Sequence, residues 1–394
     1  MAAANLQTMQ NASLVDADAQ AEALYASRMM GITITLAIGG VMTYFGTRQP
    51  RDDAPMRIKD MPEGYKPRDE LEQKAVDSYE RKQELPLIPW LMANIRWVMA
   101  TYITGVHVLA VVGLPYLLDC KVETLLALPV FYIFSGFGIT GGAHRLWSHK
   151  AYKGYTPYRF FVMLCNSMAN QGTIYHWSRD HRTHHKYSET KADPHNALRG
   201  FFYAHVGWLL FKKDPRVKFA GAHINMSDLA ALPEIKLQRR FDPWWNLFWC
   251  FGFPTLVASI GWGESPTKAY FILGVLRYVL VLNATWLVNS AAHIWGGHPY
   301  EDSHPAENPS VAILSMGEGW HNWHHAFPHD YAASELGVSA QFNPTKLFID
   351  FCAKIGLVYE RRRATEMWST RRKNKGYKNV DLVGPPFLRQ RVVS

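Results

Sequence analysis

The chain has 394 residues, of which 48% are hydrophobic and 19% are charged, and its formal net charge is +9. This composition excludes a disordered chain, a collagen-like repeat and a small protein held together by disulfides. The apolar residues gather in long runs that almost lack Lys and Arg, so the positive charge is typical of basic loops flanking membrane spans rather than of a nucleic-acid-binding surface.

Residues 1–86 form a predicted N-terminal arm with one uncharged stretch at 29–46. Its glycines and threonines make this stretch less apolar than a typical span. It could form a fifth membrane span, an interfacial helix or a loosely packed helix, and these alternatives stay open. Residues 1–27 contain acids but no basic region, which disfavours a cleaved signal peptide. Residues 48–86 are charged and contain prolines, as in a linker or a surface arm.

Four later segments are apolar over roughly the 20 residues that a helix needs to cross a bilayer. They are residues 97–118, 124–143, 243–263 and 269–294. Very short polar links join the first to the second and the third to the fourth. We therefore expect two helical hairpins whose turns lie on the same side of the membrane. Arg277 falls inside the last segment, where a structural partner such as a carbonyl is a more common explanation than catalysis.

The long segments between and after the hairpins must share the other side of the membrane. Residues 144–242 carry 16 Lys and Arg, whereas the two short turns carry only Lys121 and Lys268. The positive-inside rule assigns the basic side to the cytosol. The sequence thus predicts an all-α integral membrane protein with four transmembrane helices, a possible fifth N-terminal one, and a cytosolic helical cap.

The sequence contains 17 histidines, and nine of them occupy three clusters and one isolated position. The clustered residues are His144, His149, His181, His184, His185, His321, His324 and His325, and the isolated one is His293, with Asn289 one helical turn before it. Side chains three or four residues apart share a helix face, so each HxxHH sequence can direct two imidazoles to one place. All of these positions lie on the predicted cytosolic side, next to a membrane boundary.

Neutral imidazole binds iron, copper, nickel or zinc, and nine imidazoles exceed what one ion can take. Two neighbouring metal ions fit that number, and an imidazole-rich site without thiolates suits iron and oxygen chemistry. The HExxH zinc motif is absent from the sequence, and its four cysteines are far apart and form no CxxC, which indicates buried, unreactive thiols. Glu301 with His304 and Glu318 with His321 match the ExxH pattern of carboxylate di-iron sites, but in Pro- and Gly-rich sequence, so we interpret both matches as incidental.

The remaining histidines need no special role. We expect His107, His176, His205 and His223 to be ordinary hydrogen-bonded or surface residues. His195, His298, His304 and His329 lie near the clusters, and of these only His195 is favoured as a supporting donor rather than a loop residue.

The motifs HRLWSH at 144–149, RDHRTHHKYSETKADPHN at 179–196, NATWLVNSAAHIWG at 283–296 and GEGWHNWHHAFPHDY at 317–331, with RGFFYAHVGWLL at 199–210, are similar to the membrane-bound acyl-CoA desaturases of the stearoyl-CoA desaturase family. The similarity covers roughly residues 88–358. It implies a desaturase domain at 87–358, a basic tail at 359–394 and a location in the endoplasmic reticulum membrane. It also implies that a di-iron centre uses O2 to place a cis double bond in a saturated long-chain acyl-CoA, at the delta-9 position.

Residue by residue, the resemblance implies that the nine histidines named above bind two Fe2+ ions and that Asn289 reaches one of them through water. It implies that Arg179, Lys212 and Lys213 hold the coenzyme A phosphates, that Trp286 lines the acyl-CoA entrance and that Asn94 is a further coenzyme contact. Two features depart from the family pattern: Gly172 replaces a usual Asn that contacts the coenzyme, and the 29–46 stretch has no counterpart.

The resemblance also implies a separate electron donor, cytochrome b5 with its reductase, because no HPGG haem motif is present. Alternatives with the same centre are an acyl hydroxylase, an acetylenase or a desaturase of other regiochemistry, and a more remote one is a non-catalytic membrane metal or haem protein. An apolar tunnel within the spans would hold the acyl chain, with its floor on one of the first two.

Overall fold

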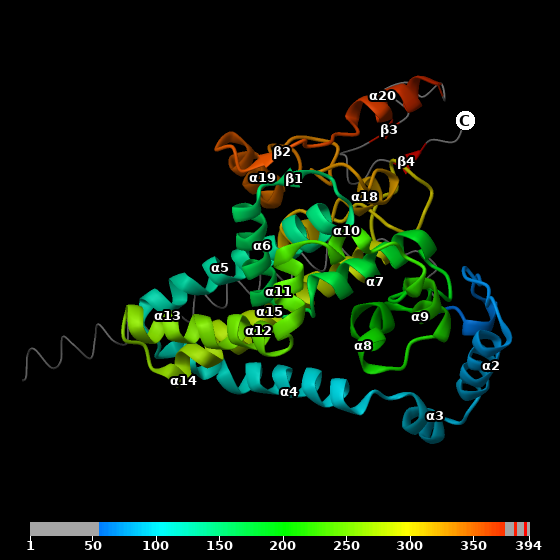
Figure 1. Ribbon diagram of the computed structural model, residues 1–394, viewed down its shortest axis with the longest axis horizontal. Coiled ribbons are helices and arrows are strands. Elements are labelled where there is room, and N and C mark those ends of the chain that lie inside the picture. The colour runs from blue at the N-terminus through cyan, green and yellow to red at the C-terminus, as the bar shows by residue number, and fades with distance from the viewer. Residues whose placement is uncertain (1–54, 375–381, 384–389, 392–394) are drawn as a thin grey trace, which may run out of the picture.

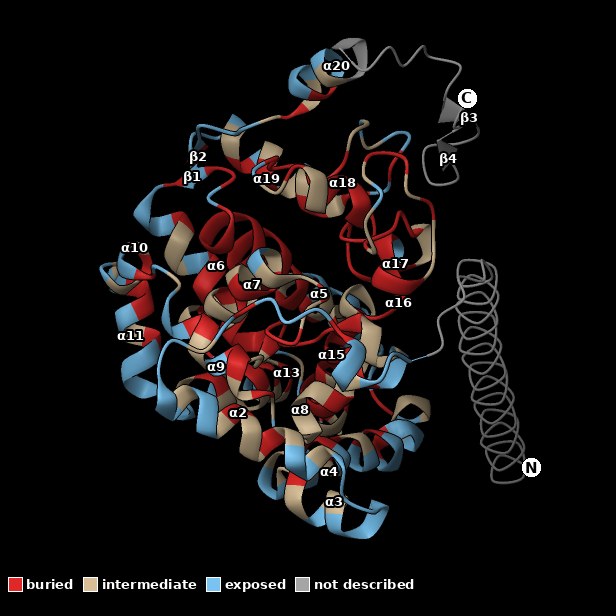
Figure 2. Cartoon of the chain, turned by 90° about the vertical axis from the view of Figure 1, so that its right-hand side faces the viewer, coloured by how far each residue is buried: buried red, intermediate tan, exposed pale blue. Residues whose placement is uncertain are grey.

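The computed structural model describes residues 55–374, 382–383 and 390–391, so the 29–46 stretch lies outside the described residues. Long helices on one side of the molecule continue into a layer of shorter helices and loops (Figure 1). Buried residues concentrate where the long helices meet this layer, around α5, α6, α7 and α15 (Figure 2). We call the shorter helices and loops the cap.

Within the described residues, three helical rods are long and apolar enough to cross a membrane: Trp97–Leu118, Val122–Ser148 and Pro266–Ile294. The first consists of α4 (Trp97–Gly113) and a 3-10 turn, Leu114–Leu118. The second consists of α5 (Val122–Phe137) and a π-helical segment, Gly138–Ser148. The third joins α14 (Pro266–Ala269), a π-helical segment at Tyr270–Leu276, α15 (Arg277–Asn289) and α16 (Ala291–Ile294). These three match predicted spans.

The predicted span at 243–263 is also helical, but it is less apolar than the other three. It is made of α12 (Trp244–Leu247), a π-helical segment at Phe248–Gly252 and α13 (Phe253–Gly261). Four tryptophans and Asn246 lower its mean hydropathy. It nevertheless packs in the membrane layer, since Trp249, Phe253 and Ala258 share a buried cluster with Ile272 and Leu273.

The two short turns meet at one end of the molecule, as the paired hairpins predict. The Glu264 carboxylate accepts hydrogen bonds from the Lys121 backbone N–H and the Thr124 hydroxyl, both at 2.7 Å. Lys268 forms an ion pair with Asp119 at 2.6 Å. These contacts tie one hairpin to the other.

Arg277 has the structural role that the sequence favours. Its side chain is fully buried, and its guanidinium donates to the carbonyls of Leu273, Met168 and Cys250 and to the Ser135 hydroxyl. A charge inside the membrane layer is thereby satisfied by backbone oxygens of neighbouring helices.

The cap is built from short helices and one two-stranded ladder. The helices are α6 (Thr156–Ala169), α7 (Ile174–Tyr187), α8 (Trp208–Leu210), α9 (Pro215–Ala222), α10 (Ser227–Ala230), α11 (Pro233–Phe241), α17 (Pro309–Leu314), α18 (His321–Ala326) and α19 (Pro344–Lys354), with 3-10 and π turns at Ala197–Arg199 and Tyr203–Gly207. Strands β1 (Lys153–Gly154) and β2 (Val358–Tyr359) pair antiparallel. Both strands and α19 lie together at one edge of the cap (Figure 1).

The described part of the N-terminal arm packs on the cap as a surface arm rather than hanging free as a linker. It contains a 3-10 turn at Ile58–Asp60 and α2 (Glu70–Gln83), and α3 (Leu87–Asn94) follows it before the first span. Lys191 pairs with Glu63 at 2.6 Å, and Arg216 pairs with Glu80 at 2.9 Å.

After β2 the chain forms α20 (Thr365–Asn374), β3 (Leu382–Val383) and β4 (Gln390–Arg391). Trp368 of α20 is buried against Tyr300 and Trp323 of the cap. The domain boundaries at residues 87 and 358 stay a prediction.

Candidate metal centre

Each histidine cluster stands on an element that directs it toward one place. His144 lies in the π-helical end of the second span, and His149 follows that segment directly. The second cluster occupies one face of α7, and the third occupies α18. The last span is interrupted at Ser290, and the short α16 that follows carries His293.

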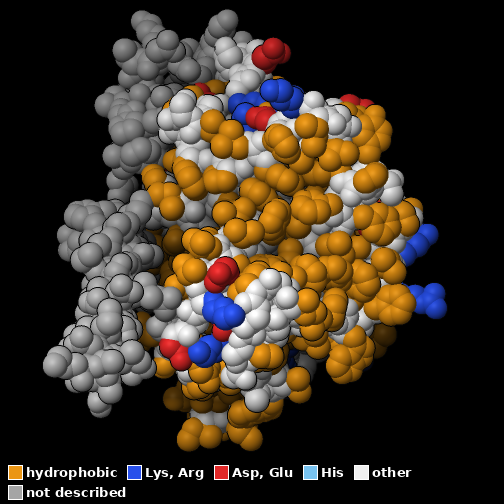
Figure 3. Space-filling view, turned by 90° about the vertical axis from the view of Figure 1, so that its left-hand side faces the viewer, with side chains coloured by type: hydrophobic (Ala, Val, Ile, Leu, Met, Phe, Trp, Pro, Cys, Tyr) orange, Lys and Arg blue, Asp and Glu red, His pale blue; other side chains and the backbone are white. Residues whose placement is uncertain are grey.

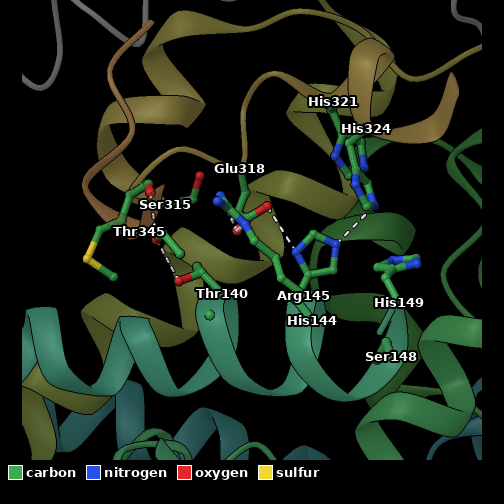
Figure 4. A network of polar contacts seen from close by, with 12 residues as sticks. Thr140, His144, Arg145, Ser148, His149, Ser315, Glu318, His321, His324 and Thr345 are labelled. Atoms are coloured by element: carbon green, nitrogen blue, oxygen red, sulfur yellow. Dashed lines mark hydrogen bonds and ion pairs between the residues drawn. The ribbon is translucent and has the colours of Figure 1, made fainter. Parts of the chain in front are cut away.

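The nine predicted histidines come together as two adjacent groups. Within each group, the nitrogen atoms that could bind a metal all lie within 4.8 Å of one another. One group contains His144, His149, His181, His185 and His324, and the other contains His184, His293, His321 and His325. Imidazole Nε2 atoms from different clusters converge: His144 lies 2.9 Å from His324, His149 2.7 Å from His181, and the isolated His293 3.0 Å from His321. Figure 4 shows His144 reaching from the second span toward His324 of α18.

Buried carboxylates lie on the outer side of this centre, where they contact the Nδ1 atoms of three imidazoles. His144 Nδ1 lies 3.0 Å from Glu318, His184 Nδ1 lies 2.9 Å from Asp193, and His293 Nδ1 lies 2.8 Å from Glu189. A carboxylate at Nδ1 fixes the proton there and turns the Nε2 lone pair toward the centre. Among the described residues, Nε2 of His184 and of His325 has no hydrogen-bond partner. This donor set fits two transition-metal ions.

Burial keeps most of these imidazoles in the neutral form that coordinates a metal. Burial and neighbouring imidazoles lower the pKa far below its usual range for the clustered histidines outside the spans: His149, His181, His185, His321, His324 and His325. Burial also acts on His184, but Asp193 raises its pKa overall. Burial alone would raise the pKa of Glu318, yet Arg145 and His144 lower it, so this carboxylate is ionised.

A cavity opens from the metal centre into the membrane layer. Its walls include four of the clustered histidines, His144, His181, His184 and His321, and Asn289 lies beside them. The rest of the lining is mostly apolar and comes from the second span, α15, the end of α17 and the loop after it, with Tyr132, Gly136, Ile139, Val281, Ala284, Val288, Leu314 and Met316. Histidines that could hold a metal ion therefore stand at the wall of a mostly apolar space.

Two of the predicted coenzyme residues form one polar group on the cap. Arg179 and Lys213 each pair with the carboxylate of Asp180 at 2.8 Å. Lys213 also lies over the Trp208 ring, 4.8 Å from its centre. Two cations share one acid, so the group keeps a net positive charge.

Lys212 and Asn94 are neighbours, but the Asn94 side chain is already engaged. The Lys212 backbone N–H donates to the Asn94 carbonyl at 2.7 Å. The buried Asn94 amide donates to the Trp90 carbonyl and accepts from Gln83. Asn94 thus holds α2 and α3 together beside Lys212.

Trp286 does not line the cavity described above. It is buried, stacks on His107 with ring centres 6.0 Å apart, and meets His205 edge-on at 5.7 Å. Gly172 stands where the family pattern usually has Asn, and it has a φ of 82°. Nothing lies within 4 Å of its Cβ position, so no neighbouring side chain occupies the place of that Asn.

Histidines outside the centre are satisfied, as predicted. His107 and His223 bond the carbonyls four residues earlier, His176 bonds Thr173, and His205 bonds Ser290. All four cysteines are buried, and none of them forms a disulfide.

Beside His184, His195 is buried with ring centres 4.3 Å apart and its Nδ1 lies 3.7 Å from Asp193. This distance exceeds that of a hydrogen bond, and the buried His195 Nδ1 has no hydrogen-bond partner among the described residues, so its role as a supporting donor stays a prediction.

Sequence reasoning missed the acids that orient the centre. Glu318 in particular was interpreted as part of an incidental ExxH match, whereas it binds His144 rather than pairing with His321 as a ligand. Glu189 and Asp193 follow the second histidine cluster closely, and acids so near to a row of histidines in a cap segment were a usable signal. Asp180 stands between Arg179 and His181 and carried no signal of its own.

Similarity to known proteins decides the family. A model described as "Fatty acid desaturase" matches residues 123–337, which include all three histidine clusters. The chain belongs to the fatty acid desaturase family. Stearoyl-CoA desaturase 5 of Homo sapiens is 48% identical over 275 residues, which are 69% of this chain and 82% of that desaturase.

Two further desaturases are as similar. Acyl-CoA desaturase 3 of Mus musculus and stearoyl-CoA desaturase of Sus scrofa are each 49% identical over 261 residues, which are 66% of this chain and 72% of those proteins. This desaturase is therefore a membrane oxidoreductase whose clustered histidines are suited to metal binding.

Proposed function

We propose that this desaturase inserts a cis double bond into a saturated long-chain acyl-CoA, at the delta-9 position, with O2 as oxidant. The observation that carries the proposal is the pair of histidine groups at the wall of a mostly apolar cavity. An acyl chain has only apolar surface to recognise, so a preformed apolar cavity is the binding site it requires. The stearoyl-CoA and acyl-CoA desaturase names of the relatives support the same substrate class.

The metals are proposed to be two Fe2+ ions held by the nine histidines, with Asn289 reaching one of them through water. Iron supplies the oxygen activation that breaking an unactivated C–H bond needs, which no side chain can provide. The protein's own contribution is to fix the imidazoles through Glu318, Asp193 and Glu189 and to keep them neutral by burial. The cavity excludes water and holds the acyl chain in one pose.

The coenzyme headgroup is proposed to bind the basic group on the cap. Arg179 and Lys213, steadied by Asp180, and the neighbouring Lys212 present donors to the coenzyme phosphates. Asn94 is proposed to contribute to coenzyme binding by holding Lys212 in position through its backbone carbonyl. Trp286 is proposed to line the entrance through which the acyl-CoA reaches the cavity.

Electrons are proposed to come from a separate cytochrome b5 and its reductase. The enzyme is proposed to lie in the endoplasmic reticulum membrane, with the cap, the C-terminus and residues 47–96 in the cytosol. The joined hairpin turns, which carry few basic residues, support this orientation because the cap carries most of them.

Expression in a host that lacks its own delta-9 desaturase tests the function. Gas chromatography of the host lipids should show a delta-9 monounsaturated chain, and a chain with His184 and His185 changed to Ala should stay in the membrane without iron or product. Hydroxylated, acetylenic or differently placed products would identify one of the related activities instead. A Soret band without non-haem iron in the purified protein would refute the proposal.

A further inference from the structure

Helix α19 carries an exposed apolar row that no described part of the chain covers. Leu347, Phe351 and Ile355 follow one another at four-residue spacing, so they lie on one side of the helix and at its C-cap. Their exposed fractions are 53%, 60% and 53%. Large apolar rows of this kind on a soluble surface mark contact with a protein or a membrane.

Other side chains of α19, next to this row and across the helix from it, pack against the second span and the helix that follows it. Phe348 stacks on Phe137 of α5 with ring centres 4.4 Å apart and planes 8° apart, and it also meets Phe161 of α6. Thr345 shares a hydrogen bond of 2.7 Å with Thr140 of the same span. The helix is therefore fixed to the span itself and not only to the cap.

The contacted residues give the depth of α19 relative to a bilayer. A helix rises 1.5 Å per residue, so Phe137 lies about 22 Å and Thr140 about 27 Å along the span from Val122. Because the hydrocarbon layer is about 30 Å thick, α19 lies at its boundary on the side away from the short turns.

The apolar row continues a surface that must face lipid. Leu126, Val130 and Ile133 are exposed on α5, at depths where only acyl chains can surround them. Helices α13, α5 and α19 lie along the same side of the molecule (Figure 1). Hydrophobic side chains cover most of that side (Figure 3).

Charges next to the row suit the lipid headgroups. Lys346, Asp350 and Lys354 form a neighbouring stripe on α19, and Asp350 pairs with both Lys346 and Arg361. Near the adjoining β ladder, Lys153 pairs with the exposed Glu360. Basic residues outnumber acids around the helix, which is the arrangement of interfacial helices on anionic membranes.

We propose that α19 is an interfacial membrane helix, with Leu347, Phe351 and Ile355 inserted among lipid acyl chains and the adjacent basic residues facing lipid phosphates. This contact seats the cap on the bilayer at a point next to the cavity, because Thr345 of α19 also donates to the carbonyl of Met316 in the cavity wall.

Spin labels on single introduced cysteines test the proposal in the full-length protein, reconstituted in phosphatidylcholine–phosphatidylserine nanodiscs. The four native cysteines are buried, so the wild-type chain gives the labelling background. Leu347→Cys, Phe351→Cys and Ile355→Cys are compared with Val130→Cys as the lipid reference and Leu71→Cys as the water reference. Leu71 is a suitable reference because it is 79% exposed on α2.

Power-saturation EPR then compares collisions of each label with O2, which concentrates in lipid, and with a water-soluble nickel chelate. We expect the α19 labels to resemble the Val130 label, with O2 collisions exceeding nickel collisions. Labels that resemble the Leu71 label would overturn the proposal. Protection from both reagents together with spin–spin broadening would overturn it in favour of a second copy of this chain.

Discussion

Glu318 lies 3.0 Å from Nδ1 of His144 and also pairs with Arg145 at 2.9 Å, so one buried carboxylate links a metal-facing imidazole to a buried guanidinium. Figure 4 shows this chain between the second span and the segment before α18. The span and the third histidine cluster are thus held in register by an acid that binds no metal in our assignment.

Glu318→Gln should weaken the metal centre without emptying it. An amide leaves the carboxylate's shape but removes the charge that fixes the His144 tautomer, and loss of such an outer partner typically costs about 10–100-fold in metal affinity or activity. Iron content per chain and desaturation rate measure the effect. Glu301→Gln is the matched control, because Glu301 belongs to the other ExxH match and only meets Arg371 at 3.7 Å near the surface. Equal losses in both variants would contradict the assignment.

Acid should destabilise the metal-free protein. Burial and neighbouring imidazoles hold the pKa of His149, His181, His321 and His324 well below the usual value of 6.5. As the pH falls below about 6.5, the unfolded chain takes up protons that the folded chain does not, so the free energy of unfolding decreases. The thermal midpoint of the chelator-treated protein should therefore fall between about pH 7.5 and pH 5.

A matched pair of variants separates this effect from general acid sensitivity. The change of His324 and His325 to Asn should flatten the decline of the thermal midpoint with falling pH. His223→Asn, at a histidine outside the centre, should leave the decline unchanged. The same decline in both variants would show that the clustered imidazoles are not its source.

The sequence predicts the parts of this site that depend on spacing within one element. His181, His184 and His185 share a face of α7 because helix geometry dictates it, and the apolar runs determine where the spans lie. It does not predict contacts that form only when distant elements meet. Glu318 on His144 and Glu189 on His293 join residues 174 and 104 positions apart, so spacing in the sequence does not pair either acid with its histidine.

Two residue roles that the resemblance implies also depend on contacts between distant elements. Asn94 is buried in bonds to Gln83 and Trp90, and Trp286 stands outside the cavity lining. Both depend on packing between the arm, the first span and the cap, which spacing in the sequence does not encode.

Arg179→Gln should raise the KM for acyl-CoA while changing kcat little. A charge-assisted hydrogen bond to a phosphate is worth about 1.5–3 kcal/mol, so a rise of about tenfold or more is expected. The difference from wild type should shrink at high salt, since exposed charges are screened. Lys153→Gln, which removes a solvent-exposed partner of Glu360 at the edge of the cap, is the control and should leave the KM unchanged. An unchanged KM in Arg179→Gln would remove this residue from the coenzyme site.

Gly136 and Met316 should set the length of acyl chain that the cavity accepts. Both line the cavity, Gly136 from the second span and Met316 from the cap, and a Cβ on Gly136 would lie 1.6 Å from the Met316 methyl. The Met316 side chain therefore fills the space that a side chain at Gly136 would occupy. The second span is one of the two that the sequence nominates for the tunnel floor, and Met316 adds a cap residue that it does not.

Gly136→Leu should shift preference toward shorter chains, because the added side chain competes with Met316 for space inside the cavity. Met316→Ala should shift it toward longer ones. One methylene in an apolar pocket changes discrimination by tenfold or more, so competition among myristoyl-, palmitoyl- and stearoyl-CoA should report a change of about tenfold. Gly105→Leu is the matched control, since nothing lies within 4 Å of its Cβ position. If Gly136→Leu keeps the wild-type preference at normal expression and iron content, the acyl chain does not reach this part of the cavity.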